Sequence, residues 1–351
     1  MGASPGLNPA GSRLRALAAA LLSVAGAGAA RADDVAEFYK AHPVSLVVGH
    51  EAGTGFDLYA RVLARHFGRH LPGAPNVDVR NMQGASGLVA GNWLYNVAPK
   101  DGSVFATFAH TVLFEPLLGD NTARFDARKF TFLANLEDGL PICGVSPGSG
   151  VSRFSDLLEK PVVFGASGGG GGPLSQATNA TRALTGAKIS LINGYRGSYD
   201  VKLAIDRGEV FGICGISDSS IRTEWRDMLD SGRFKFILRL ARKTRPDLSD
   251  APSIYDYAKT PEDNQVFDLV FGLQALGRVY LAPPGLPPAR ADALEKAMME
   301  TVADPAFRAD AAQAGLELQP ADGAAVEKLV AQFYAATPEA VARAKSAVRA
   351  K

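Results

Sequence analysis

The chain has 351 residues, of which 47% are apolar and 21% charged. That composition is globular rather than disordered, and the length is sufficient for two domains. Its 37 Lys and Arg residues nearly balance 36 Asp and Glu residues, which argues against a nucleic-acid partner because such proteins carry a basic excess.

The N-terminal segment has the pattern of a secretory signal peptide. Arg13 and Arg15 precede an apolar run over residues 16–30, and Ala30-Arg31-Ala32 forms an A-x-A cleavage site. The run is shorter than the roughly 20 residues that a membrane-spanning helix needs. We therefore predict a signal peptide over residues 1–32, cleaved after Ala32, and a soluble periplasmic protein.

Downstream, apolar strand-like runs alternate with helical patterns, which predicts an α/β fold with parallel sheets and crossover helices. The expected strands cover residues 44–49, 77–80, 104–108, 141–145, 161–166, 189–192, 210–213, 234–240 and 279–282. The expected helices cover residues 55–71, 84–94, 155–158, 173–186, 287–302, a stretch around Phe307, and 324–334. Pro173 at the start and Gly186 at the end of one helix follow the usual preference.

Two glycine-rich loops each connect a predicted strand to a predicted helix. The first contains Gly53, Thr54, Gly55, Phe56 and Asp57, and the second runs from Ser167 through five glycines to Pro173. Loops at the carboxyl ends of parallel strands bind ligands, and helix N-termini favour anions such as carboxylates. Asp57 is either a structural cap, paired with Thr54 in a capping box, or a ligand contact. In sequence, the nearest basic residues are Arg61, Lys160 and Arg182, so no Arg or Lys is expected beside either loop.

Several enzyme and metal-binding motifs are incomplete in this sequence. No Lys-Ser/Thr follows Gly172, as a P-loop would need. Residues 165–169 fit the G-x-S-x-G pattern of serine hydrolases, but all five histidines precede Ser167, which leaves a hydrolase as a remote alternative. His66 and His70 are spaced four apart without the Glu of a zinc-protease helix, which favours a solvated helix face. We expect no catalytic residue, metal or cofactor.

Cys143 and Cys214 are the only cysteines. An oxidising compartment permits a disulfide between them, but each lies in an apolar strand-like run, which favours two buried thiols. The sequence does not give their separation, so both interpretations stay open.

Seven short segments, in this order and spacing, resemble the substrate-binding proteins of tripartite tricarboxylate transporters, the Bug-type receptors. They are GTGFD at 53–57, NMQGASG at 81–87, APKDG at 98–102, the glycines at 168–172, YRGS at 195–198, RGEV at 207–210 and LAPPGLP at 281–287. The chain departs from the family in Thr54 and Gln83, and in Leu174-Ser175, where many members have a histidine.

The resemblance implies a type 2 periplasmic-binding-protein fold, with two α/β lobes and a ligand cleft between them. Lobe 1 would comprise residues 33–141 and 238–351, and lobe 2 residues 142–237, with crossings near 141–145 and 234–240. The ligand-binding residues would be Gly53, Thr54, Gly55, Phe56, Asp57, Ser167, Gly168, Gly169, Gly170, Tyr195, Arg196, Ser217 and Asp218, with Arg196 at the cleft mouth.

The resulting hypothesis is a monomeric receptor that binds a small organic carboxylate and delivers it to the membrane permease subunits of such a transporter. The alternative is a periplasmic sensing subunit of a membrane signalling system.

Overall fold

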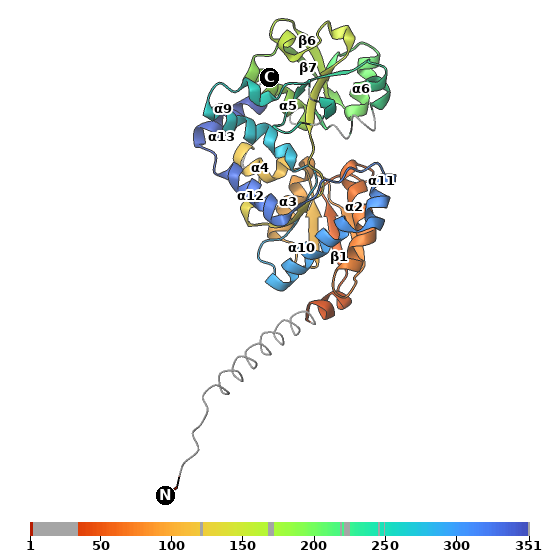
Figure 1. Cartoon of the computed structure of the whole chain (residues 1–351), viewed down its shortest axis with the longest axis vertical. Helices are drawn as coiled ribbons and strands as arrows, with labels where there is room; N and C mark the ends of the chain where they lie inside the picture. The colour runs from red at the N-terminus through yellow and green to blue at the C-terminus, as the bar shows by residue number, and fades with distance from the viewer. Residues whose placement is uncertain are drawn as a thin grey trace.

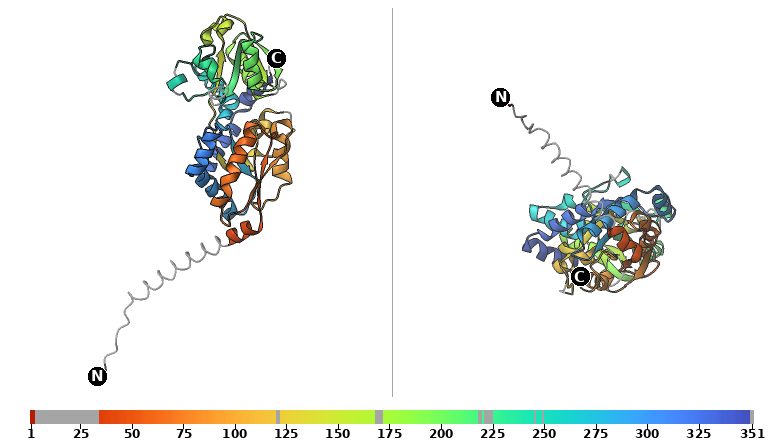
Figure 2. Two further views of the ribbon diagram at one scale, coloured as in Figure 1. Left: turned by 90° about the vertical axis from the view of Figure 1, so that its right-hand side faces the viewer. Right: turned by 90° about the horizontal axis from the view of Figure 1, so that it is seen from below.

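The computed structural model describes residues 1–2, 34–119, 122–167, 172–217, 220, 225–244, 246–248 and 250–349. These residues form two lobes, each built around one β-sheet with helices packed on it (Figures 1 and 2). The predicted signal peptide lies almost wholly outside the described residues, so the cleavage site stays a prediction. Among the described residues, no helix combines the length and the apolar character needed to cross a membrane.

Lobe 1 contains a six-stranded sheet in the order β11-β4-β10-β3-β1-β2. The strands are β1 Val44–Val48, β2 Val77–Asn81, β3 Val104–Thr107, β4 Thr131–Asn135, β10 Val279–Ala282 and β11 Ala321–Asp322. The first three pair in parallel, as predicted, but β10 inserts antiparallel between β3 and β4. The sheet is therefore mixed rather than wholly parallel.

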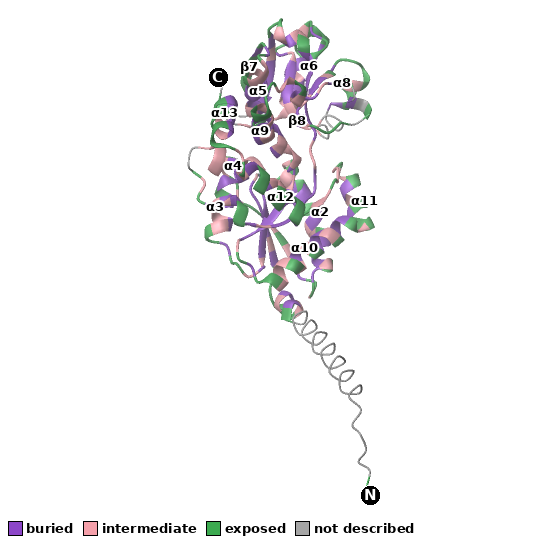
Figure 3. Cartoon of the chain, turned by 60° about the vertical axis from the view of Figure 1, so that its left-hand side comes forward, coloured by how far each residue is buried: buried purple, intermediate pink, exposed green. Residues whose placement is uncertain are grey.

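Helices cover this sheet on both faces, which explains why its central strands are continuous apolar runs. They are a helix over residues 34–41, α2 Gly55–Phe67, α3 Leu88–Asn96, α4 Thr111–Leu118, α10 Pro288–Ala303, α11 Pro305–Gln313 and α12 Gly323–Tyr334. Phe67, Phe105 and Met298 are fully buried between the sheet and these helices. Figure 3 shows the buried residues along the sheet strands and the inner helix faces.

Lobe 2 contains a five-stranded sheet in the order β7-β6-β8-β5-β9. The strands are β5 Pro141–Val145, β6 Val162–Ser167, β7 Ile189–Tyr195, β8 Gly212–Ser217 and β9 Lys235–Arg239, and the helices are α5 Pro173–Thr185, α6 Ser198–Asp206 and α8 Arg226–Asp230. Strands β6, β7 and β8 are parallel, whereas β5 is antiparallel to β8 and β9. Strand β8 begins at Gly212, two residues later than the start of the predicted strand 210–213.

Local signals set the ends of α5 as predicted. Pro173 occupies the first turn, and Gly186 follows the last residue with φ of +81°, a conformation that glycine adopts without steric cost. Short 3₁₀ turns lie at Gly68–His70, Ala85–Gly87, Ala127–Lys129, Pro147–Ser149, Phe154–Leu158, Pro246–Leu248, Ile254–Tyr257 and Gly272–Ala275.

Two helices from the C-terminal part of the chain join the lobes. Helix α13, Pro338–Arg349, packs on α5 of lobe 2, on α4 of lobe 1 and on α9, Pro261–Phe271. Figures 1 and 3 show α9 and α13 beside α5. The predicted lobe boundaries, residues 33–141 with 238–351 and residues 142–237, stay a prediction.

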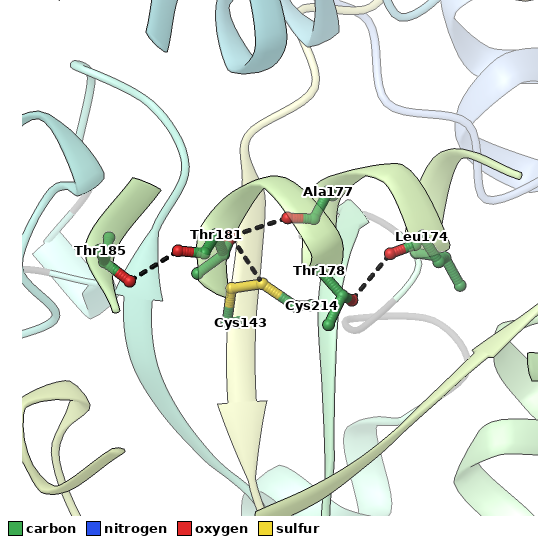
Figure 4. Close-up of a disulfide and its surroundings, with 7 residues drawn as sticks. All are labelled: Cys143, Leu174, Ala177, Thr178, Thr181, Thr185 and Cys214. Atoms are coloured by element: carbon green, nitrogen blue, oxygen red, sulfur yellow. Dashed lines mark hydrogen bonds between the residues drawn. A yellow bond between two sulfur atoms is a disulfide. The ribbon is translucent and has the colours of Figure 1, made fainter. Parts of the chain in front are cut away.

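The two cysteines form a disulfide, so the interpretation that favoured buried thiols is wrong (Figure 4). Cys143 on β5 lies directly opposite Cys214 on β8, with the Cα atoms 3.9 Å apart. Both are buried under α5, whose Thr181 hydroxyl lies 3.5 Å from the Cys214 sulfur. The antiparallel pairing of β5 with β8 creates this proximity, and the sequence contains no local signal for that pairing.

Candidate ligand cleft between the lobes

A cavity of about 820 Å³ lies between the two lobes. Ala85 and Thr111, which follow β2 and β3, line it from lobe 1, and Gln176, Asn179 and Asn193 line it from lobe 2. The first glycine loop follows β1, which lies between β2 and β3, so its place is between the two loops that reach this cavity. The carboxyl ends of the parallel strands of both lobes thus border one space, where open α/β sheets bind ligands.

A second cavity, of about 630 Å³, lies where the chain crosses between the lobes. Leu140, Pro141 and Ala241 from the crossings line it, together with Phe271 and Phe333 from α9 and α12. Among the described residues, no glycine-loop residue lines either cavity, but only the first cavity is lined by residues that follow β2 and β3 and by α5, the helix that the second glycine loop precedes. We therefore take the cavity between the strand ends as the candidate site.

Asp57 holds the first glycine loop in place. Its carboxylate is 3% exposed and accepts hydrogen bonds from the Gly53 amide (2.9 Å), from Arg61 Nε (2.8 Å) and from Asn81 Nδ2 (2.9 Å). Burial acts to raise the pKa of Asp57, but the hydrogen bonds from Arg61, Gly53 and Asn81 outweigh it and lower the pKa to about 2. Asp57 is therefore ionised and saturated by groups of lobe 1.

The helix cap differs in detail from the predicted capping box. Thr54 is the N-cap of α2, and its hydroxyl accepts from the Asp57 amide at 3.5 Å. The Asp57 carboxylate reaches the amide of Gly53 rather than that of Thr54. Gly53 itself has φ of +83°, which favours glycine at this turn.

The amides of Gly55 and Phe56 start α2 and make no hydrogen bond within the described residues. The Gly53 amide, by contrast, is engaged by Asp57. Unpaired amides at a helix N-terminus carry partial positive charge and attract anions. The Thr54 amide donates to the Glu51 carbonyl at 3.4 Å. Of the four main-chain amides from Gly53 to Phe56, those of Gly55 and Phe56 are therefore the ones open to a ligand.

Arg278 lies beside the first loop, so the expectation that no Arg or Lys lies there is wrong. A Cβ added to Gly55 would lie 3.1 Å from Arg278 Nη2. The guanidinium carbon lies 4.4 Å from the centre of the Phe56 ring and 4.9 Å from that of Tyr59. Glu137, 5% exposed, approaches Arg278 Nη1 to 3.3 Å. No local sequence pattern links Arg278 to the loop, because the two are far apart in the chain.

Two histidines stand at the same edge of the lobe 1 sheet. Burial, reinforced by the positive charge of Arg278, lowers the pKa of His50 and of His110 to about 4. His50 stacks on Phe56 with ring centres 4.1 Å apart, and His110 lines a small cavity together with Pro173 of lobe 2. Both histidines are neutral at pH 7, so the fixed positive charge beside Phe56 is that of Arg278.

In lobe 2, the predicted site residues that the structure describes lie at neighbouring strand ends. Ser167 ends β6, Tyr195 pairs with it at the end of β7, and Ser217 ends β8. Burial raises the pKa of Tyr195, and the Ser217 hydroxyl lies 3.0 Å from that of Ser220. Arg196 is exposed and pairs with Asp200 at 2.8 Å. The remaining predicted residues, Gly168, Gly169, Gly170 and Asp218, and the Ser167 side chain lie outside the described part of the structure.

His66 and His70 do not form the solvated helix face that was predicted. His66 is 7% exposed and lies 2.8 Å from the Asp310 carboxylate, and His70 lies 2.9 Å from that of Asp304. Both contacts join α2 or its 3₁₀ extension to α11 and its N-cap. Among the described residues, no group of three or more His, Cys, Asp or Glu side chains is placed to hold a metal ion.

No family model and no curated protein matches this sequence. Solved structures do match. A ligand-free TctC solute-binding protein from Polaromonas has a TM-score of 0.67 at 19% identity, covering 88% of this chain and 99% of the other. MatC from Rhodopseudomonas palustris, with bound malate, has a TM-score of 0.60 at 17% identity, covering 88% of this chain and 99% of MatC. A second R. palustris protein, with adipate, has a TM-score of 0.58 at 18% identity, covering 87% of this chain and 97% of the other. The fold predicted from the sequence is thereby confirmed: this chain has the two-lobed fold of the TctC- and Bug-type periplasmic solute-binding proteins.

Proposed function

We propose that the protein is a periplasmic receptor that binds a small organic carboxylate between its lobes and delivers it to the permease subunits of a tripartite tricarboxylate-type transporter. The observation that carries the proposal is the pair of unpaired amides, Gly55 and Phe56, at the start of α2. This helix follows β1, which lies between the two strands, β2 and β3, whose following loops line the cavity between the lobes. Malate and adipate, the ligands of two proteins with this fold, are both dicarboxylates.

The expected binding mode uses the main chain. One ligand carboxylate would accept from the amides of Gly55 and Phe56, and the loop from Ser167 to Gly170 would contribute amides from lobe 2. Thr54 and Asp57 would act by shaping the first loop, and Tyr195, Ser217 and Asp218 by lining the lobe 2 wall. Arg196 would contribute little, because its side chain is 90% exposed and already paired with Asp200.

A ligand that contacts both lobes favours the closed form, so the protein acts as a clamp rather than an enzyme. We further propose that the signal peptide is cleaved after Ala32, that lobe 1 comprises residues 33–141 and 238–351 with lobe 2 between them, and that the protein is a monomer.

A thermal-shift screen on protein stripped of co-purified ligand tests this function. Dicarboxylates, tricarboxylates and aromatic acids are compared, with adipamide as the uncharged control for adipate. A true ligand at a hundred times its Kd stabilises the native state by about 2.7 kcal/mol. An unchanged melting temperature across every acid, or an equal shift with adipate and adipamide, contradicts the proposal.

Gly55→Val tests the contact mode, because its Cβ would lie 3.1 Å from Arg278 Nη2 and its methyl groups would cover the α2 amides. We expect binding to be abolished in a folded protein. Arg196→Ala is the matched control and should weaken binding by less than about threefold, as for other exposed ion pairs. The reverse pattern would assign recognition to the Arg196 side chain.

A further inference from the structure

We propose that Arg278 forms, with the amides of Gly55 and Phe56, a carboxylate subsite on lobe 1 in which a side-chain charge recognises the ligand. This inference rests on the proposed receptor function and adds to it the residue that selects for the anion.

The topology of the sheet places Arg278 at the cleft. Strand β10 runs antiparallel to β3, so its first residue lies at the edge where β3 ends. Arg278 immediately precedes β10, and its amide donates to Asn135 Oδ1 at the end of β4 at 3.0 Å. Its guanidinium then extends to α2, with Nη2 beside Gly55.

The free hydrogen-bonding capacity of Arg278 matches a carboxylate. Nη1 donates to the Gly277 carbonyl at 2.6 Å and lies 3.3 Å from Glu137. Nε is buried without a partner, and Nη2 has no hydrogen-bond partner within the described residues. Nε and Nη2 form one edge of the guanidinium, and their two parallel N–H bonds fit the two oxygens of a carboxylate.

Other groups around the guanidinium hold this edge in position. The Phe56 and Tyr59 rings support its flat face at 4.4 and 4.9 Å. Glu137 contacts the opposite side, at Nη1, and so orients the group without occupying the free edge. The side chain of Arg278 is 22% exposed although its Nε is buried, so a ligand would approach this edge from Nη2.

Two further polar groups at the same end of the lobe 1 sheet are buried and unpaired. Thr107 on β3 and Tyr280 on β10 are directly opposite each other in the sheet, and each is 0% exposed. Neither the Thr107 hydroxyl nor the Tyr280 hydroxyl has a hydrogen-bond partner among the described residues. Buried polar atoms without partners are rare in folded proteins and mark places where a ligand or water completes the structure.

The subsite therefore fits one carboxylate of a small di- or tricarboxylic acid, held by two guanidinium N–H groups and the two amides of α2. Asp57, the carboxylate of the first glycine loop, already accepts hydrogen bonds from Gly53, Arg61 and Asn81. It does not compete for Arg278.

Isothermal titration calorimetry of paired variants tests the subsite, with the acid that most stabilises the wild type as ligand. Arg278→Met keeps the packing on Phe56 but removes the charge, and we expect affinity to fall by about 30-fold or more, as for a lost charge-assisted pair. Glu137→Gln removes the competing carboxylate, so the variant should bind as well as the wild type or more tightly. Opposite effects of the two substitutions would not arise from a purely structural ion pair.

Arg128→Met is the matched control, because Arg128 also pairs with a carboxylate, Asp126, and lies over an aromatic ring, that of Tyr334. It precedes β4 at the sheet edge away from the cleft and should leave affinity unchanged within about twofold.

Thermal melts establish folding of each variant. If Arg278→Met does not fold, Arg278→Lys decides, since it keeps the charge next to Glu137 but loses the bidentate edge and should weaken binding by about tenfold. The subsite alone is overturned if Arg278→Met binds within threefold of the wild type, or if Arg278→Lys does so where Arg278→Met does not fold. It is also overturned if Arg278→Met and Glu137→Gln lose affinity equally. If the wild type binds no carboxylate, the receptor function and the subsite are overturned together.

Discussion

Replacing Asp57 tests whether one buried carboxylate sets the shape of the ligand loop. In Asp57→Ala, the hydrogen bonds to Gly53, Arg61 and Asn81 are lost. The lowering of the pKa of Asp57 from 3.8 to about 2 corresponds to about 2 kcal/mol between its charged and neutral forms. Because Arg61 and Asn81 are exposed and regain water, we expect unfolding free energy to fall by about 2–4 kcal/mol.

Urea denaturation of ligand-free protein measures this loss. Asp322→Ala is the control, since Asp322 is the exposed N-cap of α12 with a single bond to the Ala325 amide at 2.8 Å. We expect that control to cost about 1 kcal/mol. Asp57→Ala should also weaken ligand binding by about tenfold, because the released loop no longer fixes the Gly55 and Phe56 amides. Equal destabilisation by the two substitutions, with unchanged affinity, would reduce Asp57 to an ordinary helix cap.

Three further predictions concern pH, the disulfide and a loop glycine. The pKa values of His50 and His110 lie near 4 in the native state, against an ordinary 6.5. The unfolded chain therefore takes up protons first, and stability present above pH 6.5 should be lost as pH falls towards 4, by about 2–3 kcal/mol for each histidine. Urea denaturation at pH 7 and at pH 4.5 measures this loss. If the double variant His50→Gln/His110→Gln loses as much stability between these two pH values as the wild type, the prediction is contradicted. Reducing the disulfide, which joins residues 71 apart, should lower stability by about 4 kcal/mol; no change in the melting temperature on reduction would refute that value. Gly87 has φ of +101°, and its added Cβ would lie 2.6 Å from that of Phe108, so Gly87→Ala should cost about 3 kcal/mol or more. Gly150→Ala, with φ of +69° and open space around it, should cost about 1 kcal/mol, and comparable losses in the two variants would refute the packing argument.

The sequence by itself determined those parts of the molecule that depend on neighbouring residues. The strand over Val44–Val48 and the helix from Pro173 to Gly186 were predicted because an apolar run and a Pro-to-Gly helix are local patterns. Both glycine loops were placed at strand ends for the same reason. The strands β4 and β11, the helix over residues 34–41 and the helices α4, α6, α8, α9 and α13 were not predicted.

The tertiary structure alone decided which distant segments meet. The antiparallel insertion of β10 beside β3 brings Arg278 to Gly55, and the pairing of β5 with β8 brings Cys143 to Cys214. Neither pairing has a local signal, because strand order and direction depend on how whole layers bury their apolar faces. The glycine loops were therefore foreseeable as main-chain anion sites, whereas the guanidinium beside the first of them was not.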